Sequence, residues 1–310
     1  SNCQVPDRKQ HVAHTNRLHV VVTLPILSLG LSSDLSERSE VLWNIVRIAV
    51  CTLWRSKVAS SRNASTATTV MRPKVTSSSD MHFNLENVLT FVFMDGLKLT
   101  INQETLVDVL AQKHQAAPSE YQILAALCAL RDDAKSTSLG NDKKSSERNV
   151  VDWDKVFNEL WISEQRLLQS QRTAKGTSLS RPNKPNLCAI NIIQEDSETC
   201  ACKTASSNES LIEMFYSGKL CSKKSCSQIG PCCGTILAIL HFEKNREIDG
   251  QPLKGYKTSI RNTLANANIP LISERIIPDN PIDYASTAIT ILQHLIYQEK
   301  LFCLIAAKLQ

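Results

Sequence analysis

The spacing of apolar residues changes several times along the chain, and each change predicts a new element of secondary structure. Residues 18–27 contain the β-branched run Val20-Val21-Val22-Thr23, which is typical of a strand buried on both faces. From Ser36 to residue 55 the apolar residues recur at helical spacing, and Ser36 and Glu40 are suited to cap the start of that helix. These two segments predict a first strand–helix unit.

The later apolar pattern alternates between strands and helices. Residues 88–93 and 97–101 flank Asp95-Gly96, a strong hairpin signal because both turn positions tolerate positive φ. Further strands are predicted over 187–193, 235–242 and 269–277, and further helices over 104–113, 119–131, 151–171, 258–267 and 282–304. This alternation predicts an α/β protein with three layers, α/β/α, and a mainly parallel sheet that has one antiparallel hairpin at its edge.

The segments without periodicity indicate one domain that carries several insertions. Residues 1–16 are polar and predict a flexible arm, and residues 17–310 are expected to form a single α/β domain. Polar stretches rich in Ser, Thr or Lys at about 56–80, 134–150 and 172–186 are expected to be disordered or linker segments. A Cys-rich insertion covers residues 198–234.

The composition is that of a globular protein. Hydrophobic residues make up 42% of the 310 residues and charged residues 21%, and the net charge of +5 permits an acidic partner without requiring one. The longest apolar run, residues 18–31, is interrupted by Pro25 and Gly30 and is shorter than the roughly 20 residues that a membrane helix needs. We therefore expect no membrane partner, with a secretion-signal core as the alternative reading of that run.

The cysteines bear on the cellular compartment. The chain has eleven of them, an odd number that leaves at least one unpaired in any disulfide scheme. Cys51, Cys128 and Cys303 lie inside apolar helical patterns, where a reduced thiol behaves as a small core residue. We expect an intracellular protein, nuclear or cytoplasmic, while secretion stays open because Asn63 and Asn208 start N-glycosylation triplets.

The Cys-rich insertion contains the most unusual cluster of side chains. Thiolates and imidazole are ligands that tetrahedral zinc prefers, and a zinc ion could order a loop this polar. Its Cys-x-Cys and Cys-x4-Cys spacings are less diagnostic than two Cys-x2-Cys pairs, so free thiols and disulfides stay open as alternatives. The expected cofactor is therefore none, or a structural zinc held by a subset of Cys200, Cys202, Cys221, Cys226, Cys232, Cys233 and His241.

The same insertion is basic. Lys219, Lys223 and Lys224 could contact the phosphates of a nucleic acid. No aromatic residues are interleaved with them for base stacking, so a solvated loop is the simpler interpretation. Nucleic acid stays an alternative partner.

The amphipathic helix over 151–171 offers a second candidate surface, with Trp153, Phe157 and Trp161 on its apolar side. Because linkers are expected on both sides of this helix, its apolar side could bind a partner protein. The alternative is that this side covers one face of the sheet, since a parallel sheet needs helices on both faces.

Complete catalytic motifs are absent from the sequence. It has no Gly-x4-Gly-Lys-Ser/Thr loop, no dinucleotide glycine fingerprint, no Gly-x-Ser-x-Gly elbow and no His-Glu-x2-His. The sequence therefore does not indicate an enzyme, although a site assembled from distant residues at the carboxyl ends of the strands stays open.

The predicted order of elements resembles that of a von Willebrand factor A-type domain, in which an early antiparallel hairpin forms the edge of an otherwise parallel sheet. The resemblance covers most of residues 18–304 and is one of topology. Metal-binding members of that family carry Asp-x-Ser-x-Ser just after the first strand, whereas this chain has Leu24-Pro25-Ile26-Leu27-Ser28 there. The resemblance therefore implies a metal-free member, a kind that usually serves as an interaction platform in larger complexes.

These observations favour a non-enzymatic interaction subunit or scaffold that binds other protein subunits of an intracellular complex. The first alternative is a zinc-stabilised nucleic-acid-binding protein that uses residues 200–241. The second is an enzyme with an unrecognised site at the carboxyl ends of the strands.

Overall fold

The structure is a computed structural model of the chain. It describes residues 17–33, 40–56, 81–83, 87–102, 105–106, 119–139, 151–174, 187–192, 211–216, 235–241, 254–274, 284–297 and 304. All structural statements below refer to these residues.

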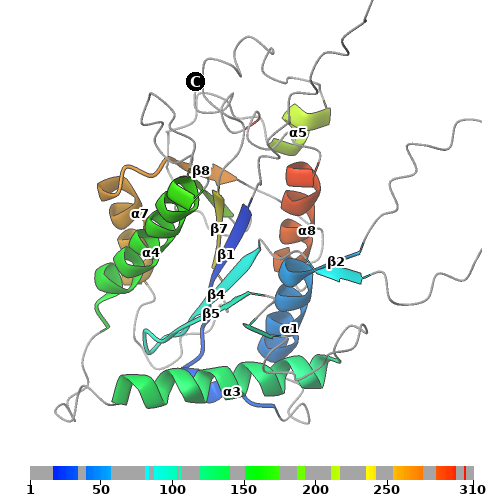
Figure 1. The fold of residues 1–310 in the computed structure, drawn as a ribbon, viewed down its shortest axis with the longest axis vertical. Coiled ribbons are helices and arrows are strands. Elements are labelled where there is room, and N and C mark those ends of the chain that lie inside the picture. Colours follow the sequence, from blue (N-terminus) through cyan, green and yellow to red (C-terminus); the bar gives the residue numbers. More distant parts are fainter. Residues whose placement is uncertain are drawn as a thin grey trace, which may run out of the picture.

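A six-stranded sheet forms the middle layer, in the order β5-β4-β1-β7-β6-β8 (Figure 1). Neighbouring strands are parallel except β4 and β5, which form the antiparallel hairpin at one edge. This confirms the predicted α/β class, with a mainly parallel sheet and one edge hairpin. The strands are β1 (Arg17–Thr23), β4 (Val88–Val92), β5 (Lys98–Asn102), β6 (Leu187–Ile192), β7 (Thr235–His241) and β8 (Leu271–Glu274).

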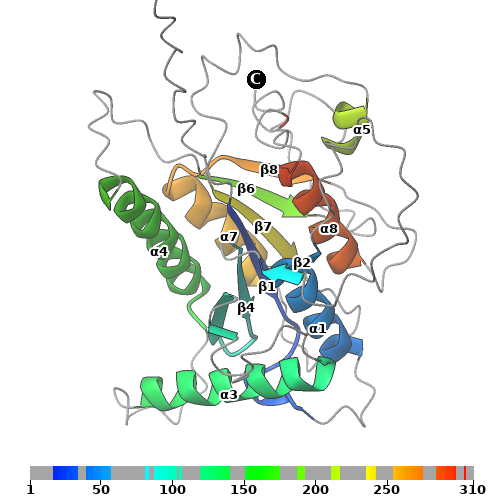
Figure 2. The ribbon, with the colours of Figure 1, turned by 45° about the vertical axis from the view of Figure 1, so that its right-hand side comes forward.

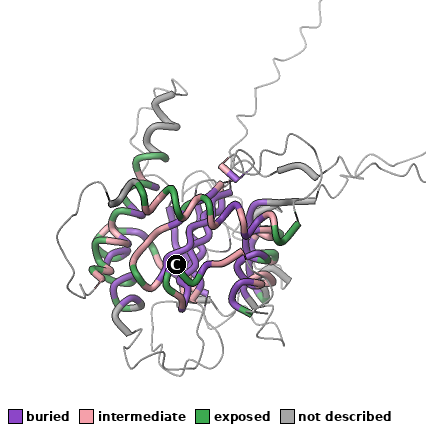
Figure 3. The backbone as a smooth tube through the Cα atoms, turned by 90° about the horizontal axis from the view of Figure 1, so that it is seen from below, coloured by how far each residue is buried: buried purple, intermediate pink, exposed green. Residues whose placement is uncertain are grey.

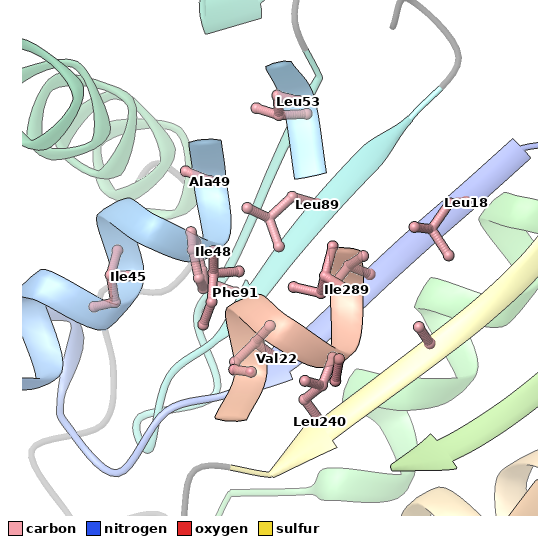
Figure 4. Close-up of a cluster of buried hydrophobic side chains, with 14 of the residues drawn as sticks. Leu18, Val22, Ile45, Ile48, Ala49, Leu53, Leu89, Phe91, Leu240 and Ile289 are labelled. Carbon is pink, nitrogen blue, oxygen red and sulfur yellow. The ribbon is translucent and has the colours of Figure 1, made fainter. Parts of the chain in front are cut away.

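The first face of the sheet is covered by α1 (Glu40–Leu53), α3 (Glu120–Leu139) and α8 (Tyr284–Tyr297). Alternate residues of β1, Leu18, Val20 and Val22, belong to this core and are fully buried. Figure 4 shows labelled side chains from β1, β4, β7, α1 and α8 gathered in the space between helices and sheet. The alternate residues of β1 and the residues that recur at helical spacing along α1 thus pack into one core.

The second face is covered by α4 (Trp153–Ala174) and α7 (Lys254–Asn266), which also pack against each other. Val21, between Val20 and Val22 in the sequence, faces this side. Because both faces are covered, β1, β4 and β7 are buried along almost their whole length, which explains their continuous apolar sequences. In Figure 3 the strands are buried in the middle, while the helices carry their exposed residues on the outside.

Four shorter elements complete the described structure. A 3-10 helix, η1 (Ser28–Gly30), follows β1, and the six-residue helix α5 (Leu211–Tyr216) lies in the Cys-rich insertion. Strands β2 (Trp54–Ser56) and β3 (Met81–Phe83) pair in a separate two-stranded sheet.

Several predicted helix ends differ from the structure; for example, α7 begins at Lys254 instead of residue 258. The helix predicted over residues 36–55 ends at Leu53, and Trp54 starts β2 instead. Side-chain amides explain this end, because Gln293 and Asn87 donate hydrogen bonds to the carbonyl of Thr52 and so occupy a terminal acceptor of the helix. Helix α3 continues to Leu139, into the segment expected to be a linker from about residue 134.

The hairpin forms at the predicted position, but of Asp95 and Gly96 only Gly96 has a positive φ. Gly96 has a φ of 78°, a region that favours glycine, and its N–H donates to the carbonyl of Phe93. The strands then pair in register from Val92 opposite Lys98 to Val88 opposite Asn102. Among the described residues, no helix has the length and apolar character needed to cross a membrane.

Candidate functional site

The carboxyl edge of the sheet is the natural place to look for a site. Strands β1 and β7 are neighbours at the centre of the sheet, and the helices that follow them, α1 and α7, cover opposite faces. In open α/β sheets, ligands bind outside the carboxyl ends of two neighbouring strands when the connections that follow those strands run to opposite faces of the sheet. Here that point lies at Thr23 and His241, which are paired in register at the ends of β1 and β7.

The polar side chains at this point bind one another. Thr23 Oγ1 lies 3.0 Å from Nδ1 of His241, and the His241 ring lies 5.3 Å from the ring of Tyr256 between centroids. Burial raises the pKa of the Tyr256 hydroxyl, and a hydrogen bond with Thr23 offsets part of this rise. Thr23 and Tyr256 are buried, so only His241 of this trio is partly open to solvent.

The segment that leaves β1, residues 24–31, is called the β1 loop below. Its backbone is bonded to the end of β4 and to the hairpin, because the Leu24 N–H donates to the Val92 carbonyl and the Met94 N–H donates to the Ile26 carbonyl. The N–H and the hydroxyl of Ser28 both donate to the Asp95 carboxylate in the hairpin turn. These bonds join two segments that lie 67 residues apart in the sequence.

Helix α3 holds the β1 loop from the other side. The Arg131 guanidinium donates to the carbonyls of Ser28 and Leu31, and the Cys128 thiol donates to the Leu31 carbonyl at 3.6 Å. Figure 2 shows the blue segment after β1 lying along α3. The β1 loop is therefore fixed by backbone and side-chain bonds from three different elements.

The fixed β1 loop exposes two large apolar side chains. Ser28 and Leu31 are buried, but Leu27 is 56% exposed and Leu29 is 75% exposed, the highest value among the large hydrophobic residues that the structure describes as exposed. Neither side chain belongs to the hydrophobic core that the described residues form. The arrangement therefore presents an apolar surface beside the point where the strand connections diverge.

A second polar cluster is buried under α4. His19 on β1 lies between Glu164 on α4, 3.0 Å from its Nδ1, and Thr90 on β4, 2.8 Å from its Nε2. Because a carboxylate only accepts hydrogen bonds, Nδ1 of His19 is the donor to Glu164. The guanidinium of Arg17 lies 3.2 Å from the other Glu164 oxygen, and Thr90 is bonded in turn to Thr100.

The hydroxyl, imidazole and carboxylate of Thr90, His19 and Glu164 follow the order of a hydrolase triad, but this cluster is closed to substrate. All three residues are buried, and α4 covers them on the second face of the sheet. Burial alone would raise the pKa of Glu164, yet hydrogen bonding and the charges of His19 and Arg17 hold it below its usual value. The cluster therefore fixes α4 on the sheet through an ionised carboxylate, whose Oε2 is bonded to His19 and whose Oε1 lies near Arg17 without a well-formed hydrogen bond.

The apolar side of α4 is the predicted protein-binding surface, and the structure places it in the core. Phe157 and Trp161 are fully buried, and the Trp161 indole N–H donates to Thr263 on α7 at 2.9 Å. Trp153 is partly buried and stacks on Phe157, with 6.0 Å between ring centroids. These residues cover the sheet, which was the alternative interpretation of the sequence.

The predicted zinc and nucleic-acid residues fall almost entirely outside the described residues. Only His241 is described, at the end of β7, while the six cysteines of the candidate zinc site and Lys219, Lys223 and Lys224 are not. Within the described ranges, no three His, Cys, Asp or Glu residues lie together in a way that could hold a metal ion. Both sites stay predictions.

Three thiols lie in the described part of the chain, those of Cys51, Cys128 and Cys188, and all three are reduced. Burial raises the pKa of each, to about 12 for Cys188 on β6. Thiols with raised pKa values are poor nucleophiles at neutral pH. Cys188 is a core residue, whereas Cys51 and Cys128, which the apolar pattern predicted to be core residues, are partly buried and pack against the core.

Comparison with known proteins does not assign a family. The sequence matches no protein-family model, and no curated protein matches it. Function therefore has to be inferred from the geometry of this chain.

Proposed function

We propose that this protein is a non-enzymatic interaction subunit, and that it binds a partner protein of a larger complex through the β1 loop. The observation that carries the proposal is the exposure of Leu27 and Leu29 on a loop whose backbone is fixed by β4, the hairpin and α3. A metal-free A-type domain would have the same role, and the antiparallel hairpin at the edge of the sheet supports that resemblance.

The energetics of the β1 loop suit docking. Burying a leucine side chain that is otherwise exposed stabilises a complex by about 1.5–3 kcal/mol. A loop that is already ordered loses little conformational entropy on binding, so more of this free energy appears as affinity. Two leucines on a rigid loop could therefore form the centre of a small interface.

The polar groups nearby support docking over catalysis. Thr23 and Tyr256 are buried and bonded, and the Thr90–His19–Glu164 cluster lies beneath α4. Zinc-dependent nucleic-acid binding through residues 200–241 depends mainly on residues outside the described part of the chain, and no described residue bears on a nuclear location. They remain predictions from the sequence.

A site-specific cross-linking experiment tests the proposal. A photo-reactive phenylalanine analogue would replace Leu29 in the full chain, expressed in its native cells, and a matched variant would carry it at Ile162, an exposed residue of α4. We expect one stoichiometric protein adduct from position 29 and none of that adduct from position 162. Equal labelling from both positions, or no protein adduct from position 29, would show that the β1 loop is not a docking surface.

A further inference from the structure

The charges around Leu27 and Leu29 bear on the chemistry of the partner. Asp95, exposed in the hairpin turn, is bonded to Ser28, which lies between the two leucines. On the other side, Asp132 of α3 is bonded to Arg131, which in turn donates to the Ser28 carbonyl. Ser28, between the two leucines in the sequence, is therefore joined to Asp95 by direct hydrogen bonds and to Asp132 through Arg131.

The carboxylates, and not the guanidinium, face solvent. The side chain of Arg131 is only 13% exposed because it is turned toward the carbonyls of the β1 loop, whereas that of Asp132 is 63% exposed. The hydrogen bond from Arg131 lowers the pKa of Asp132, so its carboxylate stays ionised at neutral pH. This surface thus has exposed apolar side chains and two exposed carboxylates at its rim, where the charge of Lys135 also acts on Asp132, on a chain whose net charge is +5.

We propose that the β1 loop binds a protein segment that carries basic side chains next to apolar ones, so that the apolar side chains cover Leu27 and Leu29 while the basic ones meet Asp95 and Asp132. This rests on the proposed function and adds the class of partner. Opposite charges at the rim of an apolar contact orient the bound partner, and they disfavour partners that carry the same charge as the surface.

A second copy of this chain fits the same surface poorly. In a two-fold symmetric dimer the same surface of both copies comes together, so the carboxylates of one copy would face the carboxylates of the other. Like charges brought together at an interface are unfavourable. The acidic rim therefore favours a different, basic segment.

Fluorescence anisotropy with two synthetic probes tests this inference. One probe is a short amphipathic peptide of leucine and lysine, and the other has glutamate in place of each lysine. The full chain would be compared with Leu27→Ser/Leu29→Ser and with Ile162→Ser/Leu167→Ser, a matched pair of exposed apolar residues on α4. Asp132→Asn would test the charge, with Glu120→Gln, about 18 Å away along α3, as its control.

We expect the lysine probe to bind the unmodified chain and the glutamate probe not to bind. The Leu27/Leu29 variant should weaken binding of the lysine probe at least about tenfold, whereas the Ile162/Leu167 variant should leave it unchanged. Asp132→Asn should weaken it about two- to fivefold, and Glu120→Gln should have no effect. Each variant needs an unchanged urea midpoint, which separates lost binding from lost folding.

The outcomes separate this inference from the proposed function. If both probes bind with equal affinity and the Leu27/Leu29 variant weakens both, the proposal of a basic partner is wrong but the proposed docking surface is supported. If binding of the probes does not depend on the leucines, both are wrong. Absence of lysine-probe binding, or a Leu29-dependent dimer of the free chain in light scattering, would also overturn the inference.

Discussion

The strongest quantitative prediction concerns the buried carboxylate of Glu164. We expect Glu164→Gln to lower the free energy of unfolding by about 2–3 kcal/mol, because hydrogen bonds to charged groups contribute about 1.5–3 kcal/mol each. The glutamine keeps the shape of the side chain and can still accept from His19, but it loses the charge that faces Arg17 at 3.2 Å. The Arg17 guanidinium, only 14% exposed, is then left without its charged partner.

The same substitution on the outer side of α4 is a matched control. Glu159 is paired with Lys98 but is 53% exposed, whereas the side chain of Glu164 is 5% exposed. An exposed ion pair contributes about 0.2–1 kcal/mol, so Glu159→Gln should cost much less than Glu164→Gln. Urea unfolding followed by circular dichroism measures both changes on the same helix.

The pH dependence has a definite sign. The pKa of Glu164 is lowered in the folded chain, so its contribution to stability is complete above its unfolded pKa, about 4.3. This contribution is lost as the pH falls through the lower, folded pKa. The stability difference between the unmodified chain and Glu164→Gln should therefore persist at neutral pH and shrink in acid below about pH 4.

Two results would refute this reasoning. Equal losses of stability for Glu164→Gln and Glu159→Gln would mean that burial does not strengthen the ion pair. A stability difference that does not change down to about pH 2 would mean that the Glu164 charge does not contribute.

Three further predictions follow from single contacts. Gly96→Ala should lower stability by more than about 1 kcal/mol in thermal unfolding, because φ is 78° and the new Cβ would lie 2.8 Å from a methyl of Val151; an unchanged midpoint would contradict this. Cys188, with a pKa of about 12, should resist iodoacetamide at neutral pH until urea unfolds the chain, as mass spectrometry of its peptide would show; rapid labelling of the folded chain would be the opposite result. Trp161→Phe should cost about 1 kcal/mol in urea unfolding through loss of the bond to Thr263, and no loss would mean that this bond is unimportant.

The fold could be predicted where local chemistry decides it. Asp95-Gly96 determined the hairpin, and the run Val20-Val21-Val22 determined a strand buried on both faces. The end of α1 could not be predicted, because it depends on Gln293 and Asn87, which are distant in the sequence from the carbonyls that they bind.

The candidate site was much harder to predict. Ser28 and Asp95 lie 67 residues apart, and His19 and Glu164 lie 145 apart, so no spacing rule joins them. One signal was available: His19 interrupts an apolar strand, and a polar residue at a buried position needs a partner. The identity of that partner follows only from the packing of α4 on the sheet.

The central position of β1 also affects how the chain folds. Thr23 pairs with His241, 218 residues later, so at roughly 5–20 residues per second the ribosome needs about 10–45 s to supply the second neighbour of β1. Until then one edge of an apolar strand stays unpaired, and such an edge is a site of aggregation. Strand order alone therefore predicts that this chain depends on chaperones during synthesis.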